Sequence, residues 1–419
     1  MSDMAWIDAA LTAARPQVLG ALLRYFRVLD AAEDAYQEAC LRALKTWPVK
    51  GPPRDPAAWL IFVGRNFALD EVRRQARQTE LPEDAALPSE PEEDTQSELA
   101  ERLDASHYRD DILRLLFVCC HPDLPATQQI ALALRMVSGL SVKEIARAFL
   151  VGESAMEQRI TRAKARISSA DVPFETPGAP ERTERLAAVS TMIYLLFNEG
   201  YAASGGNAHV RVALCAEAIR LSRLLLRLFP SESEIMGLLA LMLLQHARVA
   251  ARLDAESNIV LLEEQDRTLW DRELIGEGLA LVQKALRHQR VGPYQVQAAI
   301  SAIHSQAPRA SDTNWEEIDR LYQILETLQP SPVVTLNRAV AVSKLRGAAE
   351  ALEMIEPLAR KLNGYFYFFG LKGALLTQLG RNEEARTAFD RAIALANTAA
   401  EAAHIRLHLD RLQKDSAPA

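Results

Sequence analysis

Helical periodicity along almost the whole chain is the feature that most constrains its fold. Apolar residues recur at the three- to four-residue spacing of an amphipathic helix, and no convincing run alternates apolar and polar residues as a strand would. Leucine, alanine, arginine and glutamate dominate, and all four favour helices. The 419 residues exceed the size of one ordinary core. The sequence therefore predicts an all-α protein of two or three domains.

An acidic segment divides the chain. Residues 75–111 hold twelve acidic side chains against three basic ones. The part at 78–104 is also rich in proline and serine and lacks periodicity, a composition that buries too little apolar surface to fold and is typical of a linker. We therefore expect helical units at 1–77 and 105–172 on either side of this linker. A third helical region, 178–419, follows a short break rich in proline and glycine.

The first unit contains an amphipathic segment at residues 30–47. Its apolar stripe predicts that four residues pack inward: Ala35, Ala39, Leu41 and Leu44. The polar face carries Asp34, Gln37, Glu38 and Arg42. Because a charged face opposite an apolar one is typical of any solvated helix, the pattern alone leaves open whether this face binds a partner.

A second amphipathic segment, at residues 56–74, combines bulky residues such as Trp59 with polar and basic ones. The polar set includes Arg65, Asn66, Arg73 and Arg74. Aromatic rings beside arginines stack the bases of single-stranded DNA. Aromatic core residues beside snorkelling arginines give the same pattern, so both interpretations stay open at this point.

Residues 141–166 predict a helix-turn-helix. Ser141 and Glu144 have the spacing of a capping box at the start of the first helix. A tight turn covers 150–153, and a second helix starts at Ser154 and is expected to bury Ala155, Met156, Ile160 and Ala163. Its outer face presents Ser154, Gln158, Arg159, Arg162 and Lys164. Gln and Arg reach base edges in the major groove, while Lys and Arg neutralise phosphates, so this helix is a candidate DNA reader.

The motifs, in this order, resemble those of bacterial RNA polymerase sigma factors of the extracytoplasmic-function (ECF) type. Region 2 of that family is matched by Ala32-Glu33-Asp34, Gln37-Glu38, Leu41-Arg42, Trp59-Leu60, Arg65-Asn66, Asp70 and Arg73-Arg74. The helix-turn-helix is similar to region 4. Two positions depart from the common pattern: Cys40, where the family often has an aromatic residue, and Leu150, where it usually has glycine.

The resemblance implies a protein that binds core RNA polymerase, at the clamp and flap, and promoter DNA. Asp34, Gln37, Glu38 and Arg42 would dock on the clamp. Asn66 and its surroundings, with Arg65, would hold a flipped base of the −10 element, and Arg73 and Arg74 would contact phosphates. The helix from Ser154 would read the −35 element. The alternative is a helix-turn-helix regulator outside the sigma family, with helical repeats that bind a protein.

The long C-terminal region shows signs of an internal repeat. Leu345 and Leu379, and likewise Ala351 and Ala385, lie 34 residues apart, the period of a tetratricopeptide repeat. Four segments look like landmarks of the sigma-factor group with a tetratricopeptide-like extension: LFNEGYAASGG, QDRTLWDRELI, GPYQVQAAISAIH and LNRAVAVSKLRG. This implies an extension that regulates activity or binds a protein or peptide partner.

The cysteines lack the spacing of a metal site, and the histidine pair near the C-terminus lacks the glutamate that follows the first histidine in zinc proteases. The cysteines, Cys119 and Cys120 among them, are expected to be reduced core residues, and His404 and His408 to be paired surface histidines, so no metal site or cofactor is expected. No nucleophile–base set or phosphate-binding loop is present in the sequence, which predicts no enzymatic activity.

The N-terminus has no signal-peptide pattern, and the apolar stretch 235–244 is shorter than the roughly 20 residues that span a bilayer. We therefore expect a cytoplasmic protein with no membrane contact.

Overall fold

The structure is a computed structural model that describes residues 5–51, 53–77, 105–149, 151–169, 179–201, 208–254, 259–396 and 399–416. Within these ranges every regular element is an α- or 3-10 helix, and the β-type pairing is one isolated bridge between Leu253 and Ile259. The all-α prediction is confirmed. The predicted linker, 78–104, lies outside the described residues. The chain divides into two compact units, Met1–Leu196 and Phe197–Ala419.

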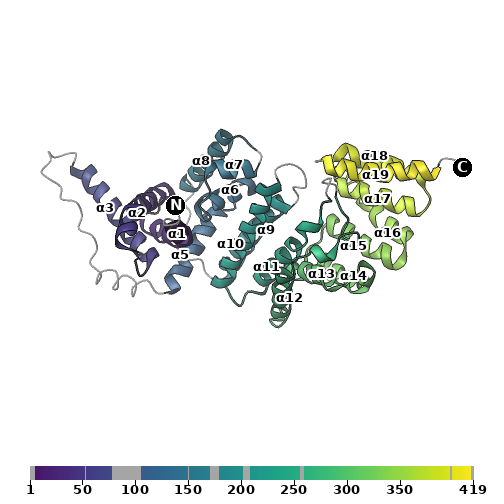
Figure 1. The fold of residues 1–419 in the computed structure, drawn as a ribbon, viewed down its shortest axis with the longest axis horizontal. Helices are drawn as coiled ribbons and strands as arrows, with labels where there is room; N and C mark the ends of the chain where they lie inside the picture. The colour runs from purple at the N-terminus through teal and green to yellow at the C-terminus, as the bar shows by residue number, and fades with distance from the viewer. Residues whose placement is uncertain are drawn as a thin grey trace. The chain divides into compact units, whose positions relative to one another are not determined.

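The first unit is a set of helices in purple to blue in Figure 1. They are α1 (Ala5–Phe26), α2 (Leu29–Lys50), α3 (Pro56–Arg77), α5 (Ala105–Cys119), α6 (Ala126–Met136), α7 (Val142–Ala148) and α8 (Glu153–Ser169). Helices α1, α2 and α3 pack on one another, α5 packs against α1, and α6 packs against α8. A further helix, α9 (Ala179–Tyr201), begins in this unit.

Three tryptophans join the first three helices. Trp47 of α2 is 2% exposed and lies between Trp6 of α1, whose ring centroid is 6.1 Å away, and Trp59 of α3 at 5.4 Å. Gly64 lets α3 approach α2, because a Cβ at this position would lie 2.9 Å from the carbonyl oxygen of Ala35. Buried aromatic rings in edge-on and stacked contact supply much of the core energy of a small bundle. This close packing fixes the position of α3 relative to α2.

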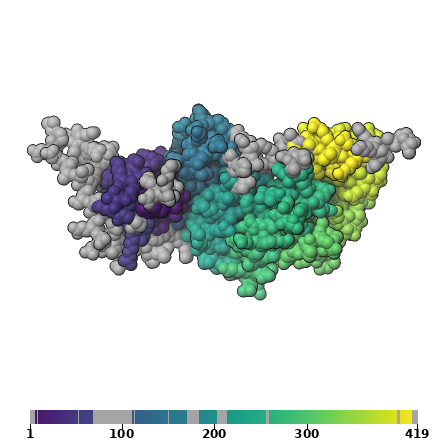
Figure 2. Space-filling view, viewed as in Figure 1, coloured from purple at the N-terminus to yellow at the C-terminus, as the bar shows by residue number. Residues whose placement is uncertain are grey.

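The second unit, teal to yellow in Figure 1, is a succession of short helices. They are α10 (Ala208–Leu228), α11 (Ser233–His246), η1 (Val249–Ala251), η2 (Arg267–Leu269), α12 (Arg272–Leu286), α13 (Pro293–Gln306), η3 (Ala310–Asp312), α14 (Trp315–Leu328), α15 (Pro332–Arg346), α16 (Ala348–Ile355), η4 (Glu356–Leu358), α17 (Phe366–Gln378), α18 (Asn382–Leu395) and α19 (Ala399–Ser416). On the face shown in Figure 2, the green helices of this unit form a continuous surface.

Helix α11 is the most apolar element. Among the described residues, one segment, Ser233–Ala251, is long and apolar enough to cross a bilayer by length and composition, and 67% of it is buried. Every residue from Ile235 to Leu244 is buried. Helices α12 and α13 both pack against α11. Residues 235–244 therefore lie within a core helix.

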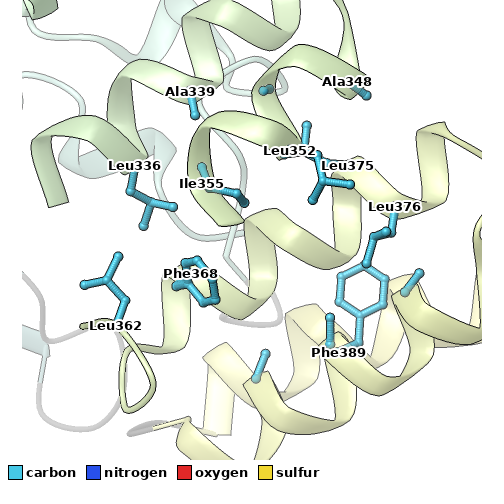
Figure 3. Close-up of a cluster of buried hydrophobic side chains, with 14 of the residues drawn as sticks. Leu336, Ala339, Ala348, Leu352, Ile355, Leu362, Phe368, Leu375, Leu376 and Phe389 are labelled. Carbon is cyan, nitrogen blue, oxygen red and sulfur yellow. The ribbon is translucent and has the colours of Figure 1, made fainter. Parts of the chain in front are cut away.

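The C-terminal helices enclose their own apolar core (Figure 3). Leu336 and Ala339 of α15, Leu352 and Ile355 of α16, Phe368 and Leu375 of α17 and Phe389 of α18 all contribute to it. Gly373 of α17 faces the ring of Phe389, because a Cβ at this position would lie 2.5 Å from the ring. The absence of a side chain at Gly373 therefore sets the distance between α17 and α18.

Substituting this glycine tests that packing. Gly373→Ala places a methyl group inside the contact distance of Phe389, and overpacking of this kind costs about 1–3 kcal/mol. Hydrogen exchange of the α17 and α18 amides should accelerate accordingly. Gly276→Ala in α12 is the matched control, because nothing lies within 4 Å of its Cβ position. That variant is expected to stabilise α12 by about 0.5–1 kcal/mol. Slower exchange in the Gly373 variant would contradict the close packing of α17 on α18 at Phe389.

Candidate polymerase and promoter interfaces

Helix α2 presents a mixed polar and apolar face to solvent. Asp34 and Gln37 are exposed, and Arg42 donates from Nε to Oε1 of Glu38 at 3.0 Å, one turn away. Leu41 is 53% exposed and Leu44 39%, whereas Ala35 and Ala39 are buried. The prediction that both leucines pack inward is therefore wrong.

The position of these leucines on the helix explains the difference. Leu41 follows Asp34 by seven residues and Gln37 by four, so all three lie on one stripe of the helix. The small side chains of Ala32, Ala35 and Ala39 already fill the buried side, where α3 approaches closely. Exposed leucines flanked by charged residues are typical of a protein-binding surface with an apolar centre and a polar rim. We call Asp34, Gln37, Glu38, Leu41, Arg42 and Leu44 the α2 face.

Helix α3 begins where the sequence predicts, because the backbone N–H of Ala58 donates to Oδ1 of Asp55 at 3.0 Å. Trp59 is only 8% exposed and contacts Trp47, so it is a core residue and does not offer a surface for bases. Arg65 is exposed, and its guanidinium lies 4.8 Å from the ring centroid of Tyr25 on α1. Asn66 is half-buried.

Tyr25 is the aromatic residue that sequence reasoning missed at this site. It is 43% exposed and also contacts Phe26 edge-on at 4.9 Å. An exposed ring with an arginine over it is a stacking surface of the kind that binds unpaired bases. No local signal marks Tyr25, since it precedes the motif and joins Arg65 through the packing of α1 on α3. The side chains of Arg73 and Arg74 lie outside the described residues.

The helix-turn-helix begins with the predicted cap. The hydroxyl of Ser141 accepts from the backbone N–H of Glu144 at 3.2 Å, and the Glu144 carboxylate accepts from the backbone N–H of Ser141 at 2.8 Å. The hydrogen bonds from Ser141 lower the pKa of Glu144. This is a complete capping box, so the N-terminus of α7 is held from both sides. Leu150, in the turn, lies outside the described residues.

Helix α8 starts at Glu153, one residue before the predicted start. It buries Met156, Ile160 and Ala163, as expected, and also Ile167. Ala155 is exposed, contrary to the prediction, because the buried stripe begins at Met156. Ser154, Gln158 and Arg162, spaced four residues apart, form an exposed row, and Arg159 is half-buried beside them. The row has the residue types and the helical spacing of a major-groove reader.

Lys164 has a different environment from the rest of that set. Its Nζ lies 2.7 Å from Oδ1 of Asp30 and 2.7 Å from Oε2 of Glu33, both on α2, and its side chain is 18% exposed. Burial disfavours its charged form, but the hydrogen bonds that it donates to Asp30 and Glu33 outweigh that effect and raise its pKa. In this structure Lys164 therefore joins α8 to α2.

Glu33 is the centre of this junction. Its side chain is 5% exposed, and Oε1 lies 2.7 Å from Nη2 of Arg135 on α6 and 3.7 Å from Nη2 of Arg15 on α1. Arg15 also donates to the carbonyl oxygens of Arg135 and Met136, each at 3.1 Å. Three cations from three helices thus meet one buried carboxylate. We call Arg15, Asp30, Glu33, Arg135 and Lys164 the Glu33 cluster.

Three further groups of residues have packing roles in the structure. Cys119 and Cys120 are buried free thiols whose pKa values burial raises, as expected of core cysteines. Trp270, in the segment QDRTLWDRELI, is 2% exposed and is therefore a core residue. His404 and His408 contact each other at 5.0 Å between ring centroids, and His408 stacks on Phe389. These two histidines therefore line a helix contact.

Comparisons with known proteins match both segments in which the sequence predicts DNA and polymerase binding. Residues 11–78 match the family model of sigma-70 region 2, and residues 114–167 match that of sigma-70 region 4. Residues 185–286 match a family of unknown function, DUF6596. An uncharacterised protein of Rhizobium meliloti (strain 1021) is 68% identical over 417 residues, which cover 100% of this chain and 98% of that protein.

The chain belongs to the sigma-70 family, as an ECF-like sigma factor with a C-terminal extension. Regions 2 and 4 imply binding to core RNA polymerase and to promoter DNA, and sigma factors act on the polymerase in the cytoplasm without catalysing a reaction of their own. The family model for part of the extension carries no function.

Proposed function

We propose that the α2 face docks on the clamp of core RNA polymerase. The observation that carries this proposal is the exposure of Leu41 and Leu44 next to Asp34, Gln37 and Glu38, within the segment that matches region 2. Burying two leucines on a partner contributes favourable free energy, and the charged rim sets orientation and association rate. The polymerase flap would contact the region 4 helices.

Promoter recognition is divided between α3 and α8 in this proposal. Arg65 and Asn66, with Tyr25, capture unpaired bases of the −10 element, while Arg73 and Arg74 neutralise phosphates. Ser154, Gln158, Arg159 and Arg162 read the −35 element in the major groove. Lys164 reaches DNA phosphates only when its ion pairs with Asp30 and Glu33 open.

Transcription with purified components tests the whole proposal. Core polymerase plus the full chain, given a library of genomic fragments, should produce transcripts with defined 5′ ends that share sequence near −10 and −35. If the chain does not co-elute with core polymerase and yields no transcript beyond the core-only background, the proposal is wrong.

The exposed row of α8 gives a sharper expectation. Gln158→Ala and Arg162→Ala are each expected to weaken −35 binding by about 1–3 kcal/mol, because each removes a pair of hydrogen bonds to a base edge. Fluorescence anisotropy on the promoter found above, compared with a duplex whose −35 element is scrambled, measures the effect. Arg320→Ala is the matched control, since Arg320 lies in α14 and its side chain is 70% exposed. Unchanged affinity in both α8 variants would remove this helix from promoter recognition.

The extension, residues 178–419, is proposed to regulate the sigma factor through a protein or peptide partner and to contain tetratricopeptide-like repeats. Helix α17 begins 34 residues after α15, at Phe366 against Pro332, and α18 begins 34 residues after α16, at Asn382 against Ala348. This spacing supports two successive helix pairs of one repeat type. A chain ending after α9 should give a transcript yield different from that of the full chain, and an equal yield would argue against regulation.

A further inference from the structure

The second unit contains a cavity of about 250 Å³ bounded by η2, α13, α14 and α15. Its walls are mainly apolar and aromatic, with Leu262, Ile318 and Val340 beside Trp315 and Tyr322. The ring of Trp315 also contacts His304 edge-on, with the ring centroids 5.3 Å apart. Flat aromatic walls with a few polar groups are typical of a site for a small molecule.

Three polar groups of the cavity come from three separate segments of sequence. Arg267 belongs to QDRTLWDRELI, His304 to GPYQVQAAISAIH and Asn337 to LNRAVAVSKLRG, and all three residues line the cavity. These segments are far apart in the chain and lie outside the residues that match sigma-70 regions 2 and 4. The fold therefore brings three residues that are distant in sequence together at one cavity.

Arg267 is anchored in the cavity wall without being neutralised. Its Nη1 donates to the carbonyl oxygens of His304 at 2.6 Å and Ala307 at 2.7 Å, and its guanidinium lies 4.5 Å from the ring centroid of Trp270. Nη1 carries two hydrogens, so these bonds leave the Nε and Nη2 hydrogens available. Within the described residues, no carboxylate is ion-paired with Arg267, and the nearby Asp312 is paired with Arg309 at 3.0 Å.

Among the other charged groups near the cavity, Arg248 adds to its positive potential. Glu263 also lines it, but its carboxylate is paired with Nζ of Lys344 at 2.8 Å. Burial, with Arg248 and Arg267 nearby, lowers the pKa of His304 to about 4, so its imidazole is neutral at pH 7. Arg248 has a buried Nε that lacks a hydrogen-bond partner among the described residues. Arg248 and Arg267 therefore favour an anion here, while His304 contributes no charge.

We propose that this cavity binds a small organic acid whose flat apolar body lies against Trp315 and Tyr322 and whose carboxylate pairs with Arg267. The size is compatible, since an apolar cavity of roughly 150 Å³ already admits benzene, and 250 Å³ leaves room for a carboxylate side chain. A guanidinium binds a carboxylate through two parallel hydrogen bonds, which its free Nε and Nη2 edge supplies. Binding would tie η2 to α13, α14 and α15 and so give the extension a ligand-dependent state, independently of how it contacts polymerase.

Calorimetric titration of the full chain tests this proposal with a panel of four probes: benzoate, phenylacetate, 3-phenylpropionate and hexanoate. At least one aromatic acid is expected to bind saturably. Its uncharged amide and acetate are each expected to bind at least about tenfold more weakly, because one lacks the charge and the other the apolar body. Absence of saturable binding by all four acids at millimolar concentration would overturn the proposal, as would equal affinity for acid and amide.

Two variants locate the binding site, and one serves as the control. Arg267→Gln removes the cation, and Val340→Phe fills the cavity while leaving Arg267 in place. Each should weaken binding at least about tenfold. Arg320→Gln is the matched control, because Arg320 is 70% exposed, pairs with Glu316 and does not line the cavity. Thermal unfolding of each variant shows that it is folded. Binding that survives in both cavity variants would place the ligand elsewhere and overturn the proposal.

Discussion

A chain carrying Leu41→Asp together with Asp34→Arg is expected to lose binding to core polymerase while it stays folded. Leu41 is 53% exposed and Asp34 is exposed, so neither change disturbs the core of the first unit. In a bound complex, the new aspartate would be buried without a partner and the new arginine would face groups that suit an acid. Residues at the centre of an interface commonly contribute about 2 kcal/mol or more each, so the pair is expected to weaken binding by about 10³-fold.

Surface plasmon resonance with immobilised core polymerase measures this loss, and run-off transcription should fall with it. Leu286→Asp supplies the control, because Leu286 is a 60% exposed leucine on α12 in the second unit. That variant should bind core polymerase as the unaltered chain does. Full binding by the double variant would show that the α2 face is not the docking surface, even if transcription still depended on the protein.

The α2 face illustrates how far local pattern predicts this site. The sequence correctly separated Asp34, Gln37 and Glu38 from the buried alanines, because charge and size differ strongly between these positions. It placed Leu41 and Leu44 in the core because an isolated helix with a wide apolar stripe does not reveal which part of the stripe meets another helix. That depends on the close approach of α3 at Gly64, which is a tertiary contact.

Helix caps were predictable because they depend on contacts between residues close in sequence. Ser141 and Asp55 act within three residues of their partners, so sequence spacing alone identifies the bonds they make. Tyr25 with Arg65, Lys164 with Asp30, and the cavity around Arg267 each join residues distant in sequence. Periodicity carries no information on such pairs. The parts of the site that sequence reasoning missed are therefore those assembled by packing between helices.

Glu33→Gln is expected to be the most destabilising conservative change in the first unit. The substitution keeps the size of the side chain but removes the buried charge that contacts Arg15, Arg135 and Lys164. Their side chains are 11%, 25% and 18% exposed, so water compensates only in part. Removing one partner of a buried ion pair costs about 3–5 kcal/mol, and we expect roughly 3 kcal/mol here.

Asp30→Asn is the matched control for this loss. Asp30 contacts the same Nζ of Lys164 at the same 2.7 Å, but its side chain is 66% exposed against 5% for Glu33. Exposed ion pairs contribute about 0–1 kcal/mol, because water already solvates both charges. Since a chain with two compact units need not unfold in one step, hydrogen exchange of the α2, α6 and α8 amides is the appropriate measurement.

The comparison separates burial from simple charge pairing as the source of the stability. If burial dominates, the Glu33 variant should exchange about 100-fold faster at α6 and α8, and the Asp30 variant should remain within about fivefold of the unaltered chain. Raising the salt concentration should reduce the difference in exchange rate between the two variants only slightly, because salt screens a buried cluster poorly. Equal acceleration in the two variants would mean that Lys164 is held by charge alone. In that case its release to promoter phosphates would require only moderate salt and not the opening of the Glu33 cluster.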